Sequence, residues 1–286
     1  MKKIKHICQY LIIKFFLILF SFTGYKISSS IGNLLGRFFG PIFKSRSLII
    51  KNLKKANINE NLNYKKISSE VFGNYGRIFG EYIHLKNFRN NKLNKYISFD
   101  GLEYLEDIRK NKKKVVFVSG HFSNFELMAM QIEKVGIDCA AIYRPLNNPY
   151  LNKIMEEIRV NYICKKQIKK GGAGTREIIK HMNDGTSIAL MIDQRVREGE
   201  KIPFFRELAT TTTIPAKLIK KYECEVVPIY IERNDSNYFK MYISKPIKLD
   251  KSKSIYEITS YLNKILEKMI LKNVGQWIWT HDRWKN

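Results

Sequence analysis

The pattern of hydrophobic and polar positions changes near residue 100. Between residues 26 and 99 apolar side chains recur at helical spacing, and this pattern is interrupted at Gly40-Pro41 and at the Asn-rich stretch from Asn57 to Asn63. We therefore expect helices separated by turns at those two places. From residue 100 onward, short apolar runs alternate with longer amphipathic stretches. This second pattern predicts strands that alternate with helices.

The apolar runs after residue 100 are typical of strands buried on both faces. They are rich in Val, Ile and Ala without polar alternation, and they cover residues 113–120, 138–144, 186–193 and 224–232. Helices between such strands indicate βαβ units. An alternating run at 238–249 predicts a last strand, and the helix after it places Ile258, Leu262 and Leu266 on one face. The expected fold class is α/β, with a mostly parallel central sheet flanked by helices.

The N-terminal segment is hydrophobic and preceded by a basic stretch. Residues 7–22 are almost entirely apolar, but Gln9 and Lys14 interrupt them. A signal peptide is disfavoured because no small-x-small cleavage site follows. The run is marginal for a span, which needs about 20 apolar residues, and positive charge flanks both of its sides. We expect a helix that lies in or dips into the membrane interface, or a short tilted span.

We therefore divide the chain into a membrane-anchoring segment, residues 1–25, and a single domain, residues 26–286. Within that domain we expect a helical part at 26–99 and an α/β core at 100–286. No low-complexity linker or internal repeat argues for a further division.

The net charge of +25 calls for an anionic partner or surface. Nucleic acid and phospholipid both qualify, and a basic nucleic-acid-binding protein is the alternative from another class. The lysines are dispersed, however, and a soluble nucleic-acid binder does not need the apolar N-terminal run, so we do not expect nucleic acid as a partner. The four cysteines lack C-x-x-C spacing and are expected to be free thiols; no metal site is predicted.

Three polar side chains follow the predicted strands at one edge of the sheet. His121 directly follows the first apolar run, Arg144 ends the second and Asp193 ends the third. Ligands bind at the carboxyl ends of strands in open α/β sheets, so a base, a cation and an acid are expected there together.

His121 begins the string HFSNFE, which ends in Glu126. We expect Ser123 or Asn124 to cap a helix whose first turn carries Glu126, so that this carboxylate faces and orients the imidazole. No serine accompanies this His–Glu dyad, and the activated hydroxyl would then belong to the substrate, as in acyl transfer from a thioester to an alcohol. The alternative is structural: His121 ends the sheet edge, and Glu126 is a first-turn carboxylate favoured by the helix dipole.

HFSNFE also fits the H-x4-D/E motif of the lysophospholipid acyltransferase superfamily, and VSGHFSNFELM resembles its lipid A biosynthesis acyltransferase branch. Further similar elements are YRPLNNPYL at 143–151, MIDQR at 191–195, IPFFRELATTTTIPAKL at 202–218, VVPIY at 226–230 and QWIWTHDRWK at 276–285. The Glu-Gly-Thr-Arg element of glycerol-phosphate acyltransferases has no counterpart. The branch usually has Gly after the phenylalanine pair, where this chain has Arg206.

The resemblance implies an O-acyltransferase in lipopolysaccharide biosynthesis. The acyl donor would be acyl-acyl carrier protein or acyl-CoA, a co-substrate, with no cofactor or metal, and the acceptor would be an anionic glycolipid, a lipid A precursor. It implies a bacterial inner membrane protein with its catalytic domain on the cytoplasmic face. A same-fold acyltransferase acting on another membrane glycolipid or phospholipid remains an alternative.

The residues that match the family's motifs receive roles by the same resemblance. His121 and Glu126 would be catalytic, and the candidate substrate-binding residues are Asn124, Arg144, Asp193 and Gln194. Arg144 would contact a phosphate, and Asp193 with Gln194 would order the site or bind a sugar hydroxyl. The tryptophans Trp277, Trp279 and Trp284 fit either membrane anchors or core residues, and the histidines His84, His181 and His281 are interpreted as ordinary ones.

Overall fold

The computed structural model describes residues 2–58, 62–234 and 237–285. Its N-terminal part is helical, as predicted, with α1 (Lys2–Ser21), α2 (Tyr25–Phe43), α3 (Arg46–Ala56), α4 (Tyr64–Glu81), η1 (Tyr82–His84), α5 (Leu85–Arg89) and η2 (Asn94–Tyr96). The turn expected at Gly40-Pro41 is wrong, because α2 continues through Pro41 to Phe43. A turn does separate α3 from α4, although residues 59–61 of the predicted Asn57–Asn63 stretch lie outside the described residues.

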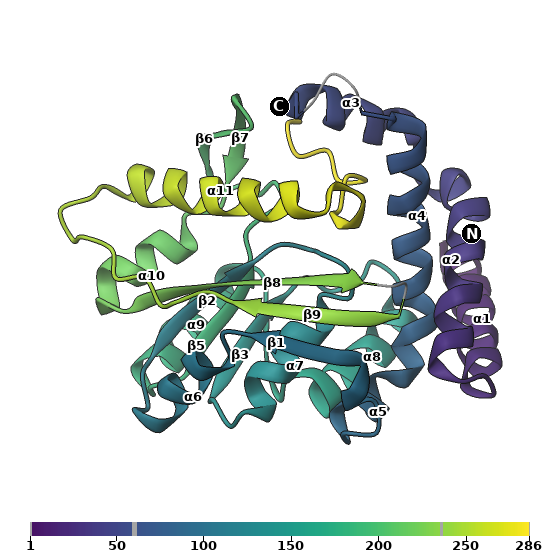
Figure 1. Ribbon diagram of the computed structural model, residues 1–286, viewed down its shortest axis with the longest axis horizontal. Coiled ribbons are helices and arrows are strands. Elements are labelled where there is room, and N and C mark those ends of the chain that lie inside the picture. Colours follow the sequence, from purple (N-terminus) through teal and green to yellow (C-terminus); the bar gives the residue numbers. More distant parts are fainter. Residues whose placement is uncertain (1, 59–61, 235–236, 286) are drawn as a thin grey trace.

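Helices α2 and α4 lie side by side (Figure 1) and approach each other through small residues. A Cβ on Gly76 of α4 would overlap the carbonyl oxygen of Gly32 in α2, and a Cβ on Gly36 would overlap the carbonyl oxygen of Phe72. Only glycine allows two backbones to come this close. The GNYG and IGNLLG strings therefore fix the position of α2 on α4.

The second part of the chain alternates strands with helices. Its elements are β1 (Ile97–Asp100), α6 (Leu102–Lys110), β2 (Val115–Ser119), α7 (Glu126–Lys134), β3 (Cys139–Tyr143), α8 (Pro149–Ile158), η3 (Arg159–Ile163), β4 (Lys166–Lys169), α9 (Gly172–Asn183), β5 (Ser187–Met191), β6 (Glu200–Phe204), β7 (Glu207–Thr211), α10 (Ile214–Tyr222), β8 (Glu225–Asn234), β9 (Tyr238–Ile243), α11 (Ile255–Lys272) and η4 (Val274–Gln276). Each apolar run that was predicted to be a strand contains one.

The seven-stranded sheet has the order β1-β9-β8-β2-β5-β3-β4 and is parallel except for the β8–β9 pair. The expected α/β class with a mostly parallel sheet is confirmed. Strand β1 falls in the part expected to be helical, and β4 and the antiparallel hairpin β6–β7 were not predicted. Figure 1 shows α11 on one side of the sheet and α6 and α7 on the other.

The C-terminal segment belongs to the core. Trp277, Trp279 and Trp284 are all buried, which decides between the two interpretations of these tryptophans in favour of core residues. A capping box formed by Ser254 and Glu257 begins α11, whose predicted apolar face is buried against the domain. The four cysteines are free thiols, three of them buried.

Candidate active site

The order of the sheet brings His121 and Asp193 together. Strands β2 and β5 are parallel neighbours that pair Ser119 with Met191, and the backbone N–H of Ile192 donates to the carbonyl of Ser119 at 2.9 Å. The residues two positions beyond each strand end therefore meet. Nδ1 of His121 lies 2.8 Å from Oδ1 of Asp193, and the backbone N–H of His121 donates to Oδ2 at 2.7 Å.

Asp193 is fully buried, and Nε1–H of Trp277 also donates to its Oδ2, at 2.9 Å. Burial by itself raises the pKa of this carboxyl, but the nearby His121 and the hydrogen bonds from His121 and Trp277 outweigh burial and lower the pKa below its ordinary value. Asp193 is therefore ionised at neutral pH. An ionised carboxylate only accepts hydrogen bonds, so Nδ1 of His121 carries the hydrogen and Nε2 is left as a base.

Glu126 is held by other partners. Its Oε1 accepts from Tyr82 Oη at 3.0 Å and from Nε and Nη2 of Arg159 at 3.1 and 2.6 Å. Burial alone would lower the pKa of Arg159, but the negative charge of Glu126 outweighs burial, and the pKa of Arg159 is raised above its ordinary value. The orienting position at Nδ1 of His121, expected for Glu126, is taken by Asp193. Glu126 begins α7 and lines the same cavity as His121, and its catalytic role stays a prediction.

His121 and Glu126 open onto a cavity of about 570 Å³. Its lining includes Gln194 and three cationic side chains, those of Lys44, Arg144 and Lys170. Burial and the charge of Arg144 lower the pKa of Lys170. The interior is apolar, with Val118, Met128, Ala129, Ile132, Ile142, Ile163 and Leu190 in its lining. The cavity thus offers a base, cationic groups and room for a hydrocarbon chain.

Asn124 does not line this cavity, although it was expected to bind substrate. It is fully buried, and its Nδ2 donates to Oε2 of Glu81 at 2.9 Å. The expectation that Ser123 or Asn124 caps the helix is wrong, since α7 begins at Glu126 without a side-chain cap. Ser123 instead adopts a left-handed φ of 44° and donates its N–H to the carbonyl of Gln276 at 2.9 Å.

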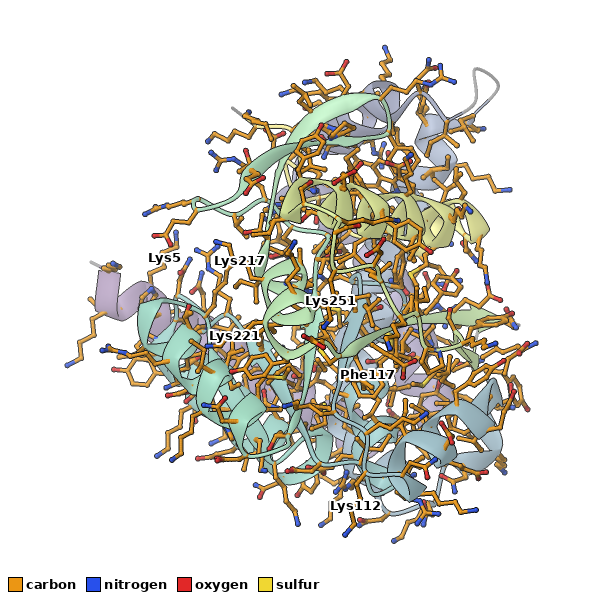
Figure 2. All side chains as sticks on the ribbon, turned by 90° about the vertical axis from the view of Figure 1, so that its left-hand side faces the viewer. Lys5, Lys112, Phe117, Lys217, Lys221 and Lys251 are labelled. Atoms are coloured by element: carbon orange, nitrogen blue, oxygen red, sulfur yellow. The ribbon has the colours of Figure 1, made fainter. Side chains whose placement is uncertain are left out.

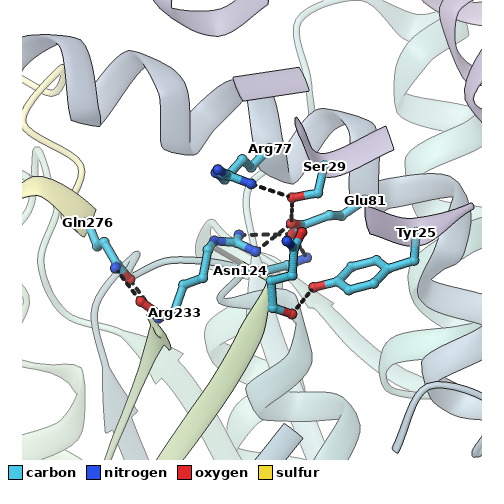
Figure 3. Close-up of polar contacts among 8 residues, drawn as sticks. Tyr25, Ser29, Arg77, Glu81, Asn124, Arg233 and Gln276 are labelled. Carbon is cyan, nitrogen blue, oxygen red and sulfur yellow. Dashed lines mark hydrogen bonds and ion pairs between the residues drawn. The ribbon is translucent and has the colours of Figure 1, made fainter. Parts of the chain in front are cut away.

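A buried ion pair supports the turn that carries His121 (Figure 3). Glu81 at the end of α4 accepts from Nη1 and Nη2 of Arg233 at 2.5 and 3.0 Å, and from Oγ of Ser29 in α2 at 2.6 Å. Side-chain Oε1 of Gln276 accepts from the backbone N–H of Arg233 at 2.8 Å. This network joins α2, α4 and β8 to Asn124, three residues after His121.

Comparison with known proteins assigns the chain to a family. Residues 1–286 match the family model described as bacterial lipid A biosynthesis acyltransferase. The chain belongs to this family.

Its relatives include three curated proteins. A lipid A biosynthesis acyltransferase of Haemophilus influenzae is 26% identical over 201 residues, 68% of this chain and 63% of the relative, which is less than two thirds of its length. The lipid A biosynthesis palmitoleoyltransferase of Escherichia coli is 22% identical over 91% of this chain and 86% of the relative. The lauroyltransferase of the same species is 27% identical over 65% of this chain and 60% of the relative.

Among solved structures, the 1-acyl-sn-glycerophosphate acyltransferase PlsC of Thermotoga maritima is similar with a TM-score of 0.43 and 12% identity, covering 89% of this chain and 100% of that one. Within the part of the chain that the structure describes, no group of three or more His, Cys, Asp or Glu side chains is placed to hold a metal ion.

Sequence reasoning did not single out Glu81, Arg159 or Arg233. Arg233 directly follows the apolar run at 224–232, at the same edge of the sheet as His121 and Asp193, so the strand-end rule could have found it. Glu81 and Arg159 carry no comparable signal. Each lies in an amphipathic helical stretch, and only the fold shows that each is turned inward.

Proposed function

We propose that this member of the family transfers a fatty acyl group from a thioester, acyl-acyl carrier protein or acyl-CoA, to a hydroxyl of a lipid A precursor. The observation that carries this proposal is the His121–Asp193 pair at a cavity with an apolar interior. An imidazole with Nδ1 bound to a buried carboxylate is a general base at Nε2. Family membership and the names of the relatives supply the substrate class.

In the reaction, Nε2 of His121 takes the proton of the acceptor hydroxyl while its oxygen attacks the thioester carbonyl. A C–O bond forms, and the carbonyl electron pair moves to its oxygen. When the tetrahedral intermediate collapses, the C–S bond breaks and the thiolate takes the proton back from His121. Asp193 stabilises the imidazolium in between, because its ionised carboxylate lies 2.8 Å from Nδ1. No nucleophile of the protein is needed.

Glu126 is proposed as the second acid of the site. Its carboxylate stands in the cavity wall and forms two hydrogen bonds with Arg159, which sits in a π-helical turn, η3, after α8. Two N–H donors on one carboxylate oxygen hold it in place and compensate its burial. In this position Glu126 holds the part of the cavity wall beside which the reacting groups align. Its negative charge adds to the electrostatic stabilisation of the His121 imidazolium.

The cavity lining suits the proposed acceptor and donor. Lys44, Arg144 and Lys170 can contact the phosphates of a lipid A precursor, and Gln194 can bind a sugar hydroxyl. The apolar interior would take the acyl chain. Figure 2 labels five lysines in one view of the molecule, Lys112, Lys221 and Lys251 among them. With a net charge of +25, the chain attracts a strongly acidic carrier protein.

We propose that the protein acts at the cytoplasmic face of the bacterial inner membrane, and its N-terminal helices support contact with a membrane. By length and composition, α1 is apolar enough to cross a membrane, since it has 20 residues and contains an 18-residue window with a mean hydropathy of 1.6. Large apolar side chains are exposed on both α1 and α2, among them Leu11, Phe15, Leu34, Phe38 and Ile42. Two neighbouring helices with exposed apolar faces fit a hairpin seated among lipid tails.

Expression in a strain that lacks its own secondary lipid A acyltransferases tests the proposal. Mass spectrometry of its lipid A should show one added acyl chain, and the mass increment reports the chain length. The variants His121→Ala and Glu126→Ala should fold and give no increment. Unchanged lipid A with the wild-type chain refutes the acceptor, and full transfer by the purified His121→Ala or Glu126→Ala variant refutes the role of that residue.

A further inference from the structure

A second histidine lines the cavity, and the proposed reaction leaves it without a task. His281 lies in the C-terminal segment and shares the cavity with His121. Its backbone is fixed by buried Asn52 of α3, whose Nδ2 donates to the carbonyls of Trp279 and His281 at 2.9 and 2.8 Å. The position of the ring is therefore set by the fold.

The hydrogen bonds of His281 determine its tautomer. Its Nε2 lies 2.9 Å from the backbone nitrogen of Arg195, and a backbone N–H can only donate. Nε2 must therefore be the bare nitrogen, and the hydrogen of the neutral ring is on Nδ1. Burial lowers the pKa of His281 to about 4, so the ring is neutral near pH 7. Within residues 2–58, 62–234 and 237–285, no hydrogen-bond partner of Nδ1 is found.

We propose that the Nδ1–H of His281 donates a hydrogen bond to the acyl carbonyl oxygen of the bound thioester as that oxygen becomes negative. The two histidines of the cavity then have opposite roles, which their partners set. His121 gives its Nδ1 hydrogen to a carboxylate and is a base at Nε2, whereas His281 receives an amide hydrogen at Nε2 and is a donor at Nδ1.

A fixed donor of this kind favours the transition state. The carbonyl oxygen gains its charge only as the tetrahedral intermediate forms, so a donor that is already in place stabilises the intermediate more than the bound thioester. Because His281 is neutral and its Nε2 is occupied, it does not compete with His121 for the proton. This inference rests on the proposed acyl transfer, since it assigns a part of that reaction.

Two amide variants separate the two nitrogens of the ring. His281→Gln places its side-chain oxygen near the former Nε2 and can still accept from Arg195, but it lacks the donor at Nδ1. His281→Asn can place its amide N–H near Nδ1. Removing such a donor is expected to lower kcat by about 10²–10³ fold in His281→Gln with KM nearly unchanged, whereas His281→Asn should stay within about tenfold of the wild type.

The assay uses purified full-length protein, lauroyl-acyl carrier protein and a lipid A precursor with free hydroxyls. His181→Gln is the matched control, because His181 does not line the cavity; it should keep wild-type kcat. A ¹⁵N-histidine spectrum of the wild-type protein, which needs no activity, should show one ring that stays neutral with its hydrogen on Nδ1 between pH 5 and 8.

The outcomes distinguish this role from the proposed function. An active wild type with kcat of His281→Gln within threefold of it overturns the role of His281 alone, as does a loss confined to KM. A charged ring, or one with its hydrogen on Nε2, overturns it even where the variants fail to fold. A wild type that transfers no acyl group overturns the proposed function and this role with it.

Discussion

Nδ1 of His121 and Oδ1 of Asp193 lie 2.8 Å apart although 72 residues separate them in the chain. The pairing follows from the neighbouring positions of β2 and β5 in the sheet. Asp193 also accepts from the backbone N–H of His121, so one carboxylate fixes both the ring and the start of the turn that follows β2. The acid thus sets the tautomer of His121 and the position of its ring.

Asp193→Asn should reduce transfer because its amide removes the negative charge that stabilises the imidazolium. We expect kcat to fall by about 10²–10⁴ fold, the range typical of general-base catalysis and its orienting acid. Steady-state kinetics of the purified variant measures this. Asp184→Asn, at an exposed position after α9, is the control. A rate for Asp193→Asn near that of the control would contradict the role of the acid.

Glu81→Gln should destabilise the protein because it leaves the buried Arg233 without its charge partner. Breaking one side of a buried pair typically costs about 3–5 kcal/mol of unfolding free energy. The matched control is Asp107→Asn, which removes an exposed pair with Lys113 and should leave unfolding nearly unchanged. Urea denaturation of both compares them. Equal stability of the two variants would show that the Glu81–Arg233 network does not hold the turn.

Arg206→Gly should stabilise the β6–β7 hairpin. Phe205 and Arg206 both have left-handed backbones, with φ of 49° and 66°, as in a type I′ turn. An L-residue other than Gly pays roughly 1 kcal/mol for this conformation, so the melting temperature should rise by about 2–4 °C. Gly185→Ala is the control with the opposite expected effect. Gly185 has a φ of 84° and a Cβ there meets no atom within 4 Å, so the alanine should lower the melting temperature through backbone strain alone. A lower melting temperature for Arg206→Gly would mean that the arginine side chain stabilises the hairpin.

Gly76→Ala should separate α2 from α4. The new methyl group would overlap the carbonyl of Gly32, and backbone cannot move aside without shifting a helix. Overpacking of this kind costs about 1–3 kcal/mol or more. Gly24→Ala is the control, because a Cβ there meets nothing within 4 Å. Thermal unfolding in detergent should rank Gly76→Ala well below Gly24→Ala, and coincident curves would argue against this helix contact.

His281 predicts a pH dependence of stability. Burial lowers its pKa to about 4, and the charged groups around it are Asp193, Arg283, His121 and Asp282. As pH falls from about 6.5 to 4, the unfolded chain binds a proton that the folded chain excludes, so stability is lost over this range and not above it. His281→Gln removes that loss. The difference between the unfolding free energies at pH 7 and at pH 5 should therefore be smaller in His281→Gln than in the wild type. An equal difference in the two proteins would contradict a buried, neutral ring at His281.

The sheet could be predicted largely from the sequence, because strands buried on both faces leave continuous apolar runs. Strands β4 and β6 lack such runs and were missed; β4 reads KQIK, and only Ile168 in it is buried. The hairpin is antiparallel and partly exposed. Strand order is not encoded locally, so the neighbours of β2 could not be known.

The candidate site was likewise predictable only in part. The strand-end rule placed His121, Arg144 and Asp193 at one edge, but it could not say which acid would reach the imidazole. Glu126 was chosen for its nearness in sequence, yet Arg159 and Tyr82 bind it from elements far along the chain. Asn124, which was expected to bind substrate, shows the same limit, because its partner Glu81 comes from the separate N-terminal helices and no local pattern indicates that contact.

Helix α2 has two unlike sides. One side exposes large apolar side chains. On the other side, the hydroxyl of Ser29 donates to Glu81, which also accepts from Asn124, three residues after His121. Under the proposed function, α2 contacts the bilayer. Two hydrogen bonds, Ser29 to Glu81 and Asn124 to Glu81, then connect this helix to the turn that carries His121. A glycolipid can then be acylated while its own acyl chains stay in the membrane leaflet. When lipid is removed from the enzyme, its transfer rate should fall under conditions in which the protein is still folded.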